Sequence, residues 1–395
     1  MSDNGVTTAS RLERAAFIAL AAFAAALQIS IAIAQILLTV AGALWVALLI
    51  TRQERITVPR WSWFLGAYAG LTLMSAMMSL APITSITDSK QLLLFLIVPG
   101  VYRLARGRKA LTIATVIISV GAASAIVGIV QYGILEYDNL GSRPQGLLTH
   151  YMTYSGLLML VAGMAAARLL FHGRDRTWPA LVLPALLVAL ALTFTRSAMV
   201  GTCVGIGMLL VLKDFRLLAL APIVAVLFIA VAPEQVTARL YSTFDLQDKT
   251  ARDRVAMIRT GVRLVRDYPV MGVGPDMVKE VYADYRDPAA VQESNPHLHN
   301  VPIQIAAERG IPALLVWMAL VVALTRGLVQ LLRTGTYRSL PAGGLAAVAS
   351  MLAAGMFEYN FGDSEFLMLW LVLVTLPFAA DADTVTSHVP TAEPA

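Results

Sequence analysis

Residues 15–50 read AAFIALAAFAAALQISIAIAQILLTVAGALWVALLI, an apolar run that contains no charged side chain. A helix needs about 20 apolar residues to cross the hydrocarbon core of a bilayer, so this run is too long for one crossing. Its polar residues Gln28, Ser30 and Gln35 lie in its central part. We therefore expect two membrane-spanning helices joined by a tight turn.

Apolar blocks of similar length recur along the chain. The expected spans are 12–29, 31–50, 61–82, 90–105, 110–131, 151–170, 178–195, 197–212, 217–233, 311–331, 340–357 and 365–380. The 395 residues are 58% hydrophobic and only 14% charged. A water-soluble multidomain protein of this size needs more charged surface. The predicted fold class is an all-α polytopic membrane protein with about twelve transmembrane helices.

Basic residues divide the connecting segments into two sets. One set carries most of the basic clusters, at 11–14, 52–60, 103–109, 168–176, 213–216 and 326–338. The positive-inside rule makes the side with these clusters cytoplasmic. Both termini are then cytoplasmic, and one large extracytoplasmic loop lies between helices 9 and 10.

The chain accordingly divides into four parts. Residues 1–233 contain helices 1–9, residues 234–310 form the large loop with amphipathic helices, and residues 311–380 contain helices 10–12. The polar, proline-containing residues 381–395 are expected to be a disordered cytoplasmic tail. The net charge of +5 does not indicate a nucleic-acid partner, because the basic residues are not gathered on one face. Membrane lipids are the expected surroundings, and the single Cys203 excludes an internal disulfide.

The large loop contains an arginine-rich stretch, TARDRVAMIRTGVRLVRDYPVMGVGPD at 250–276, which predicts an amphipathic surface helix that ends before Pro269. At about 100° per residue, four arginines share one face, as expected for a surface in contact with water or lipid headgroups. These four are Arg252, Arg259, Arg263 and Arg266. Arg254 falls on an apolar arc instead, where a guanidinium must reach water or bind an anion.

A second unusual charge is Arg196, which separates two apolar blocks in ALTFTRSAMVGT at 191–202. An arginine at the outer rim of a membrane either extends to the interface or binds a ligand. Two outward-facing arginines at one cavity suit a diphosphate, and a membrane-embedded diphosphate indicates a polyprenol-linked substrate. Arg143 and His150, at the outer end of the sixth helix, could join this pocket or anchor their loop.

Two histidines lie in NPHLHNVPIQIAAERG, residues 295–310. A neutral imidazole at the mouth of a cavity can deprotonate or orient a sugar hydroxyl near neutral pH. His297 and His299 could instead bind a metal ion or cap the tenth helix. The sequence shows no evident third ligand, so we predict no metal site.

The spacing of these residues resembles the O-antigen ligase and polymerase superfamily. His299 and Asn300, followed after nine residues by Gly310, match the His-Asn-x9-Gly signature of that superfamily. Upstream, Arg254 precedes DYPVMGVGP at 267–275, which resembles the Arg-then-Pro-x-x-Gly-x-Gly stretch of the same proteins. Arg196, after a short helix hairpin, matches the other recurrent arginine.

The resemblance implies a GT-C-type glycosyltransferase that acts on the periplasmic face of the inner membrane of a Gram-negative bacterium. It implies transfer of O-antigen from undecaprenyl diphosphate to a sugar hydroxyl of lipid A-core, with inversion and without metal or other cofactor. Arg196 and Arg254 would bind the diphosphate, and His299 would orient or deprotonate the acceptor hydroxyl. His297 and Asn300 would support them. We expect the protein to act as a monomer.

Several alternatives remain open. An O-antigen polymerase uses a similar donor with a second lipid-linked glycan as acceptor, and a protein O-oligosaccharyltransferase uses a protein acceptor. A transporter of lipid-linked glycans is a different class, but it would be expected to place polar groups near the middle of the bilayer. Asp276, Asp363 and Glu365 face outward in the predicted topology, so any of them could be the base instead of His299. His297 could be the base as well, since either histidine could lie nearest the acceptor.

Overall fold

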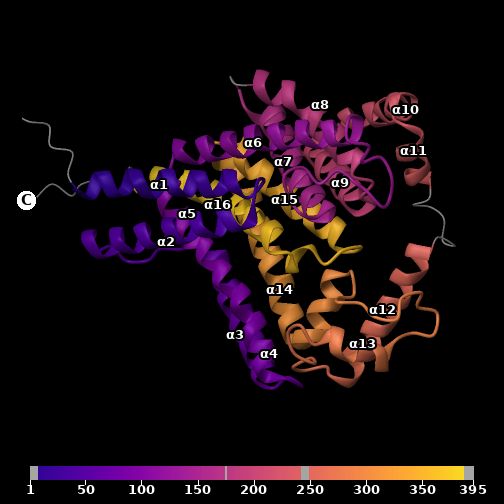
Figure 1. Ribbon diagram of the computed structural model, residues 1–395. Coiled ribbons are helices and arrows are strands. Elements are labelled where there is room, and N and C mark those ends of the chain that lie inside the picture. The colour runs from indigo at the N-terminus through magenta and orange to yellow at the C-terminus, as the bar shows by residue number, and fades with distance from the viewer. Residues whose placement is uncertain (1–7, 174–175, 242–248, 387–395) are drawn as a thin grey trace, which may run out of the picture.

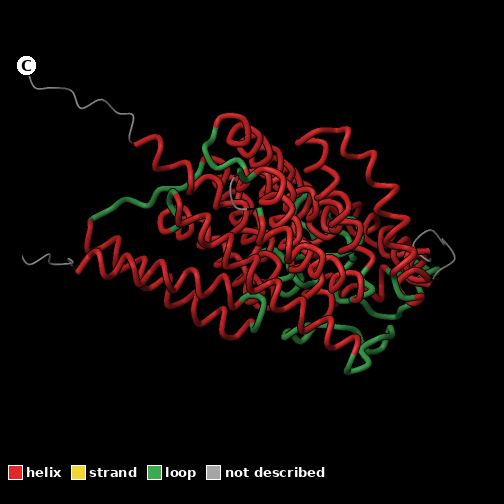
Figure 2. Tube along the Cα trace, turned by 90° about the horizontal axis from the view of Figure 1, so that it is seen from above, coloured by secondary structure: helices red, strands yellow, loops and turns green. Residues whose placement is uncertain are grey.

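The computed structural model describes residues 8–173, 176–241 and 249–386, and within these ranges it contains helices and loops and no β-strand (Figure 2). The first half contains α1 (Thr8–Ala26), α2 (Ile31–Arg52), the 3-10 helix η1 (Arg60–Ser62), α3 (Trp63–Met77), α4 (Pro82–Asp88), η2 (Ser89–Leu96), α5 (Ile97–Leu104), α6 (Arg108–Gly133), α7 (Tyr151–Phe171) and α8 (Thr177–Leu192). The second half contains α9 (Arg196–Asp214), η3 (Phe215–Leu220), α10 (Ala221–Val231), α11 (Glu234–Tyr241), α12 (Lys249–Asp267), α13 (Val278–Tyr285), α14 (Val301–Thr334), α15 (Ser339–Gly355), η5 (Asn360–Gly362) and α16 (Ser364–Thr386).

Each predicted apolar block overlaps one or more of these helices. Within the described ranges, 5 helices are long and apolar enough to cross a membrane, namely α2, α6, α7, α14 and the Ser364–Ala382 part of α16. The described part of the chain is therefore all-helical and has the helices of a membrane protein, and the number of twelve crossings stays a prediction. The last helix continues to Thr386, beyond the predicted end of the span at 380. The rest of the predicted tail, 387–395, lies outside the described residues.

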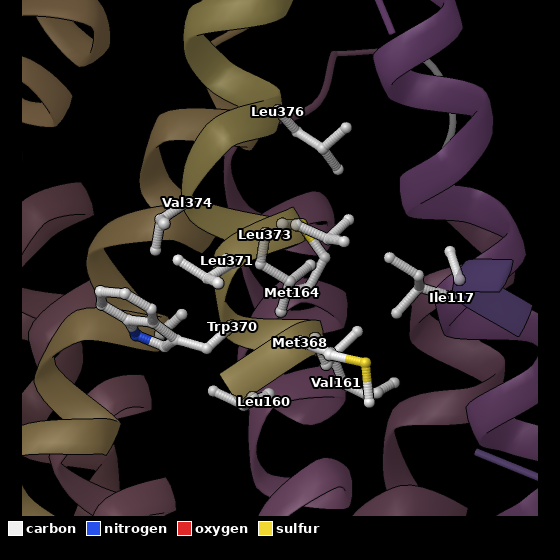
Figure 3. Close-up of a cluster of buried hydrophobic side chains, with 14 of the residues drawn as sticks. Ile117, Leu160, Val161, Met164, Met368, Trp370, Leu371, Leu373, Val374 and Leu376 are labelled. Atoms are coloured by element: carbon white, nitrogen blue, oxygen red, sulfur yellow. The ribbon is translucent and has the colours of Figure 1, made fainter. Parts of the chain in front are cut away.

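The centre of the bundle is formed by α7 and α16. In the apolar 18-residue stretch of each of these helices, 78% of the residues are buried, whereas only 22% are buried in the corresponding stretch of α2. Helices α7 and α16 are therefore interior, and α2 is peripheral. Figure 3 shows Met368 and Leu373 of α16 gathered with Val161 of α7, and Ile117 of α6 across from them. Trp370 of α16 is fully buried. A helix that is apolar on all sides is stable in such an interior because every face meets another helix.

Small residues allow α9, α15 and α7 to approach one another closely. A methyl group at Gly201 or Gly205 of α9 would overlap Ser350 of α15, and one at Gly343 of α15 would overlap Met164 of α7. Close packing through small residues stabilises helix contacts in lipid, where burial of apolar area alone gives little driving force. This packing fixes the beginning of α9, and therefore Arg196, relative to the chain that follows α15.

An ion-pair network joins α1, α2, α5 and α6. Glu13 lies 2.8 Å from Arg52, 3.6 Å from Arg103 and 3.2 Å from Lys109. The three basic residues belong to clusters that the sequence predicts to be cytoplasmic. The structure brings these helix ends together, while the orientation of the protein in the membrane stays a prediction.

The chain between α11 and α14 contains α12 and α13, which lie beside the outer part of α14 and away from α1 and α2 (Figure 1). Their shared core includes Met257, Leu264, Val278 and Tyr282. The arginine-rich pattern predicted both the helix and its exposed face, since α12 covers Lys249–Asp267 and exposes the four aligned arginines, Arg252, Arg259, Arg263 and Arg266.

Three backbone hydrogen bonds attach this region to α14, and we call them the backbone clamp. The N–H groups donate to carbonyl oxygens in the pairs Val273 to Ala307 (2.9 Å), Gly274 to Glu308 (2.9 Å) and Ile311 to Pro269 (2.8 Å). The stretch 269–274 is thus a structural turn packed on a helix. The clamp places the end of α12 against the first part of α14.

The clamp depends on glycines that leave room for the opposing backbone. Gly310 has φ 82° and ψ 168°, which interrupts the helical conformation of α14. A Cβ at Gly310 would overlap the carbonyl oxygen of Val270, and a Cβ at Gly272 would overlap the backbone of Glu308. The glycine of the His-Asn-x9-Gly spacing is therefore required by a bend and a close chain crossing.

We expect Gly310→Ala to destabilise the protein by at least about 3 kcal/mol, because it combines an unfavourable positive φ with the overlap at Val270. Gly70→Ala in α3 is the matched control, since nothing lies within 4 Å of a Cβ at Gly70. It should change stability by no more than about 1 kcal/mol. Thermal unfolding of the detergent-solubilised proteins measures both effects. Equal melting temperatures for the two variants would show that the bend is not needed.

Candidate functional site

A cavity of about 580 Å³ opens among the beginnings of α7 and α9, the link between α15 and α16, and the chain that precedes α14. Its polar lining includes Asp88, Gln91, His150, Thr153, Asp276, Gln292, Asn295, His297, His299, Arg309, Glu358, Tyr359 and Asp363. A space of this size accepts part of a large ligand, such as a few sugar units. Both predicted histidines therefore share one concave site with carboxylates and amides.

The histidines meet at Glu358, in the link between α15 and α16. Glu358 Oε1 accepts hydrogen bonds from His299 Nδ1 at 2.9 Å and from His297 Nε2 at 3.3 Å. The two imidazole rings are 4.3 Å apart between centroids. An ionised carboxylate can only accept, so the proton of His299 is assigned to Nδ1. Nε2 of His299 is then left with a lone pair, and no partner for it lies within the described residues.

Glu358 is ionised in this arrangement. Burial raises the pKa of its carboxyl group, but the hydrogen bonds from His297 and His299 and the electrostatic attraction to both rings outweigh this effect, and the pKa is lowered well below its usual range. The ionised carboxylate orients His299 and would stabilise the imidazolium formed when Nε2 takes up a proton. The pair therefore has the arrangement of a general base supported by a carboxylate.

Arg254 lies beside the same carboxylate. Its Nη2 atom is 4.0 Å from Glu358 Oε2, and Nη1 is buried with no hydrogen-bond partner among the described residues. Burial lowers the pKa of Arg254, an effect that Glu358 partly offsets and the charge of Arg196 reinforces. A buried guanidinium with an unused donor, close to a second arginine, is a suitable site for an anion.

Arg143, which the sequence suggested as a further member of the anion pocket, interacts electrostatically with Arg196. Arg143 lies 4.3 Å above the ring of Tyr151, and burial lowers its pKa, with a further contribution from the charge of Arg196. The ring of His150 stacks on the ring of Tyr151, with 5.0 Å between their centroids. Tyr151 also interacts electrostatically with Arg254. Arg143 and Arg254 thus both interact electrostatically with Tyr151, in the first turn of α7, and with Arg196, whereas none of the three arginines is part of the cavity lining.

Local backbone structure explains how the histidines reach the cavity. His299 adopts a left-handed conformation with φ 48°, directly before α14. Asn300 caps that helix, because its Oδ1 accepts from the Ile303 N–H at 3.0 Å, and its Nδ2 donates to the Met356 carbonyl at 3.1 Å. Asn300 is buried and does not line the cavity. Its contacts are structural and connect the histidine segment to the end of α15.

The other carboxylates that the sequence predicts to face outward have different surroundings. Asp276 accepts from Lys279 at 2.6 Å. Asp363 accepts from the Thr153 hydroxyl at 2.6 Å and from the Phe366 N–H at 2.9 Å. Glu365 lies in the first turn of α16 and is not part of the cavity lining. Each histidine, in contrast, has the Glu358 carboxylate on one ring nitrogen and the other nitrogen free of protein contacts within the described chain; the contact of His299 is the shorter of the two.

Two functional groups were missed by the sequence reasoning. Glu358 is 59 residues after His299. The sequence feature that could have identified it is its position in the link between the last two apolar blocks, on the predicted outer side. Arg309 forms a buried ion pair with Glu308 at 2.6 Å and donates to the Tyr359 hydroxyl at 3.3 Å. Glu308 and Arg309 belong to the end of the predicted loop but lie in α14, where they line the cavity together with Asp88.

The histidine pair also has the third ligand that the sequence did not show. His297, His299 and Glu358 each offer a ligand atom, and these atoms all lie within 4.8 Å of one another. Within the described residues this is the only group of three such side chains that could bind a metal ion.

Residues 179–318 match the family model described as O-antigen ligase, and this match confirms the resemblance to the O-antigen ligase and polymerase superfamily. The matched segment runs from α8 into α14 and includes Arg196, Arg254, His297 and His299. Glu358 lies outside it. No curated protein matches the chain.

We expect Glu358→Gln to destabilise the protein in a pH-dependent way. Because the pKa of the folded carboxyl lies below its usual value of 4.5, ionised Glu358 stabilises the fold above that pH, and this contribution is lost as the pH falls. The melting temperature of the variant should be below that of the wild type at about pH 7, and the difference should shrink below about pH 4.5. Glu280→Gln, at an exposed position of α13, is the control. A difference in melting temperature that does not depend on pH would contradict the stabilising role of the ionised Glu358 carboxylate.

Proposed function

Starting from the match of residues 179–318 to the O-antigen ligase family, we propose that this protein transfers O-antigen from undecaprenyl diphosphate to a sugar hydroxyl of lipid A-core. The observation that carries the proposal is the position of His299. Its Nδ1 is bound to the half-buried Glu358 carboxylate, its Nε2 has a free lone pair, and Arg254 lies next to the same carboxylate.

In the proposed reaction, His299 Nε2 takes the proton from the acceptor hydroxyl as its oxygen attacks the anomeric carbon. The new bond joins that oxygen to the anomeric carbon, and the bond from this carbon to the diphosphate oxygen breaks with its electron pair. Attack on the face opposite the leaving group inverts the configuration. Glu358 stabilises the imidazolium until the proton is released to solvent.

The leaving diphosphate gains negative charge, which must be stabilised for the reaction to be fast. Arg254 and Arg196 supply fixed positive charge at one side of the site, and Arg143 lies within electrostatic range of Arg196. A guanidinium offers a planar pair of donors to phosphate oxygens. This charge can replace the divalent cation that many glycosyltransferases use, so the proposed reaction needs no metal.

His297 and His150 line the cavity and are proposed to contact the sugars of donor or acceptor. The role of Asn300 is proposed to be indirect, through the position of His299. The reaction would take place on the periplasmic face of the inner membrane, with both termini cytoplasmic. The GT-C architecture with about twelve crossings and a monomeric state complete the proposal.

A reconstitution tests the function directly. Purified protein in detergent is mixed with undecaprenyl diphosphate-linked O-antigen and lipid A-core in the presence of EDTA, and the products are separated on a gel. Conversion of lipid A-core to a larger glycosylated species is the expected result. Growth of the lipid-linked glycan with unmodified lipid A-core would make the protein a polymerase, and transfer to an added protein acceptor would make it a protein O-oligosaccharyltransferase. With no product in any arm, the transporter class becomes the better explanation.

In the same assay we expect His299→Ala to lower the transfer rate about 10²- to 10⁴-fold, as is typical for loss of a general base. Arg254→Ala should lower it about 10²- to 10³-fold, through loss of leaving-group stabilisation. Arg266→Ala, on the exposed face of the same helix, is the matched control and should retain the wild-type rate. A His299→Ala protein that folds and transfers at the wild-type rate would remove His299 from the mechanism.

A further inference from the structure

The cluster of His297, His299 and Glu358 has the composition of a metal site. We propose that it binds Zn²⁺, and that bound zinc inhibits glycosyl transfer by occupying the general base. The inhibition rests on the proposed function, whereas the binding of zinc does not.

The geometry suits a small divalent ion. Bonds of about 2.0–2.1 Å in a tetrahedral zinc site place neighbouring ligand atoms about 3.3 Å apart. In the cluster, Glu358 Oε1 is 2.9 Å from His299 Nδ1 and 3.3 Å from His297 Nε2, so the ligand atoms need only small shifts to surround an ion. Two imidazole nitrogens and one carboxylate oxygen are the ligand types of an open, three-ligand zinc site.

The surroundings fix the ligands before a metal arrives. The Tyr359 N–H donates to Glu358 Oε1 at 3.1 Å, and the Leu298 N–H, between the two histidines, donates to Gln304 Oε1 at 2.7 Å. The second carboxylate oxygen of Glu358 is buried and has no hydrogen-bond partner within the described chain. Preorganised ligands raise metal affinity, while the positive charge of Arg254, 4.0 Å from that second oxygen, lowers it.

Metal binding at this position removes the base. In the metal-free site, His299 has its proton on Nδ1, where it donates to Glu358, and Nε2 can accept a proton from the substrate. Zinc bound to Nδ1 displaces that proton, so the neutral imidazole has its proton on Nε2 instead. A protonated Nε2 can only donate a hydrogen bond and therefore cannot deprotonate the acceptor hydroxyl. Removal of the metal restores the first state.

Zinc binding is measured first, without any glycan. Tag-free wild-type protein in detergent is dialysed against ZnCl2, and bound metal is quantified by elemental analysis beside His297→Ala, Glu358→Gln and His172→Ala. His172, which follows the far end of α7, is the matched histidine control. We expect about one zinc per chain in the wild type and in His172→Ala, and several-fold less in the two cluster variants. Equal zinc content in all four proteins overturns the proposal.

The transfer assay then tests the consequence. Zinc should suppress transfer by the wild type and by His172→Ala, and EDTA should restore it, whereas residual transfer by His297→Ala should not respond to zinc. Stimulation by zinc, or equal inhibition of His297→Ala, overturns the inhibitory role. If no protein shows transfer with or without EDTA, the proposed function fails, and the dialysis result alone decides whether the metal site exists.

Discussion

The backbone clamp between 269–274 and 307–311 is the contact on which the site depends. Its three hydrogen bonds attach the end of α12 to α14, so the helix that carries Arg254 and the segment that carries His299 have one fixed relation. Backbone groups can approach this closely only where no Cβ intervenes, and Gly272 and Gly310 both meet opposing backbone atoms. The region that contains α12 and α13 is therefore joined to the helix bundle by main-chain contacts at the place where the chemistry is proposed.

Glu358 is the electrostatic centre of the site. One of its oxygens accepts from His297, His299 and the Tyr359 N–H, and the other lies near Arg254. A single half-buried carboxylate thus orients the proposed base and balances part of the charge of the proposed anion site. The same carboxylate completes a set of three metal ligands, which is why a proton-transfer site and a zinc site can be built from identical atoms.

The motif residues have two different kinds of role. Asn300 caps α14 and binds the Met356 carbonyl, and Gly310 bends the same helix where the chain crosses it. These two residues set geometry. His299 and Arg254 present the groups that can react with or bind a substrate. In this chain the His-Asn-x9-Gly spacing therefore combines residues that set geometry with a histidine that lines the cavity, and hydrogen bonds and burial separate the two kinds.

The sequence by itself determined the class of protein, because apolar blocks of membrane-crossing length and sparse charges permit little else. It also determined the arginine-rich helix and singled out Arg196, Arg254 and His299, since charges and imidazoles among apolar residues stand out. Only the tertiary structure decided which of these groups meet. Glu358 has no local pattern that links it to a histidine 59 residues earlier, and its role arises because α15 ends beside the start of α14. The bend at Gly310 and the interior position of α16 likewise follow from packing between distant segments, which local periodicity does not encode.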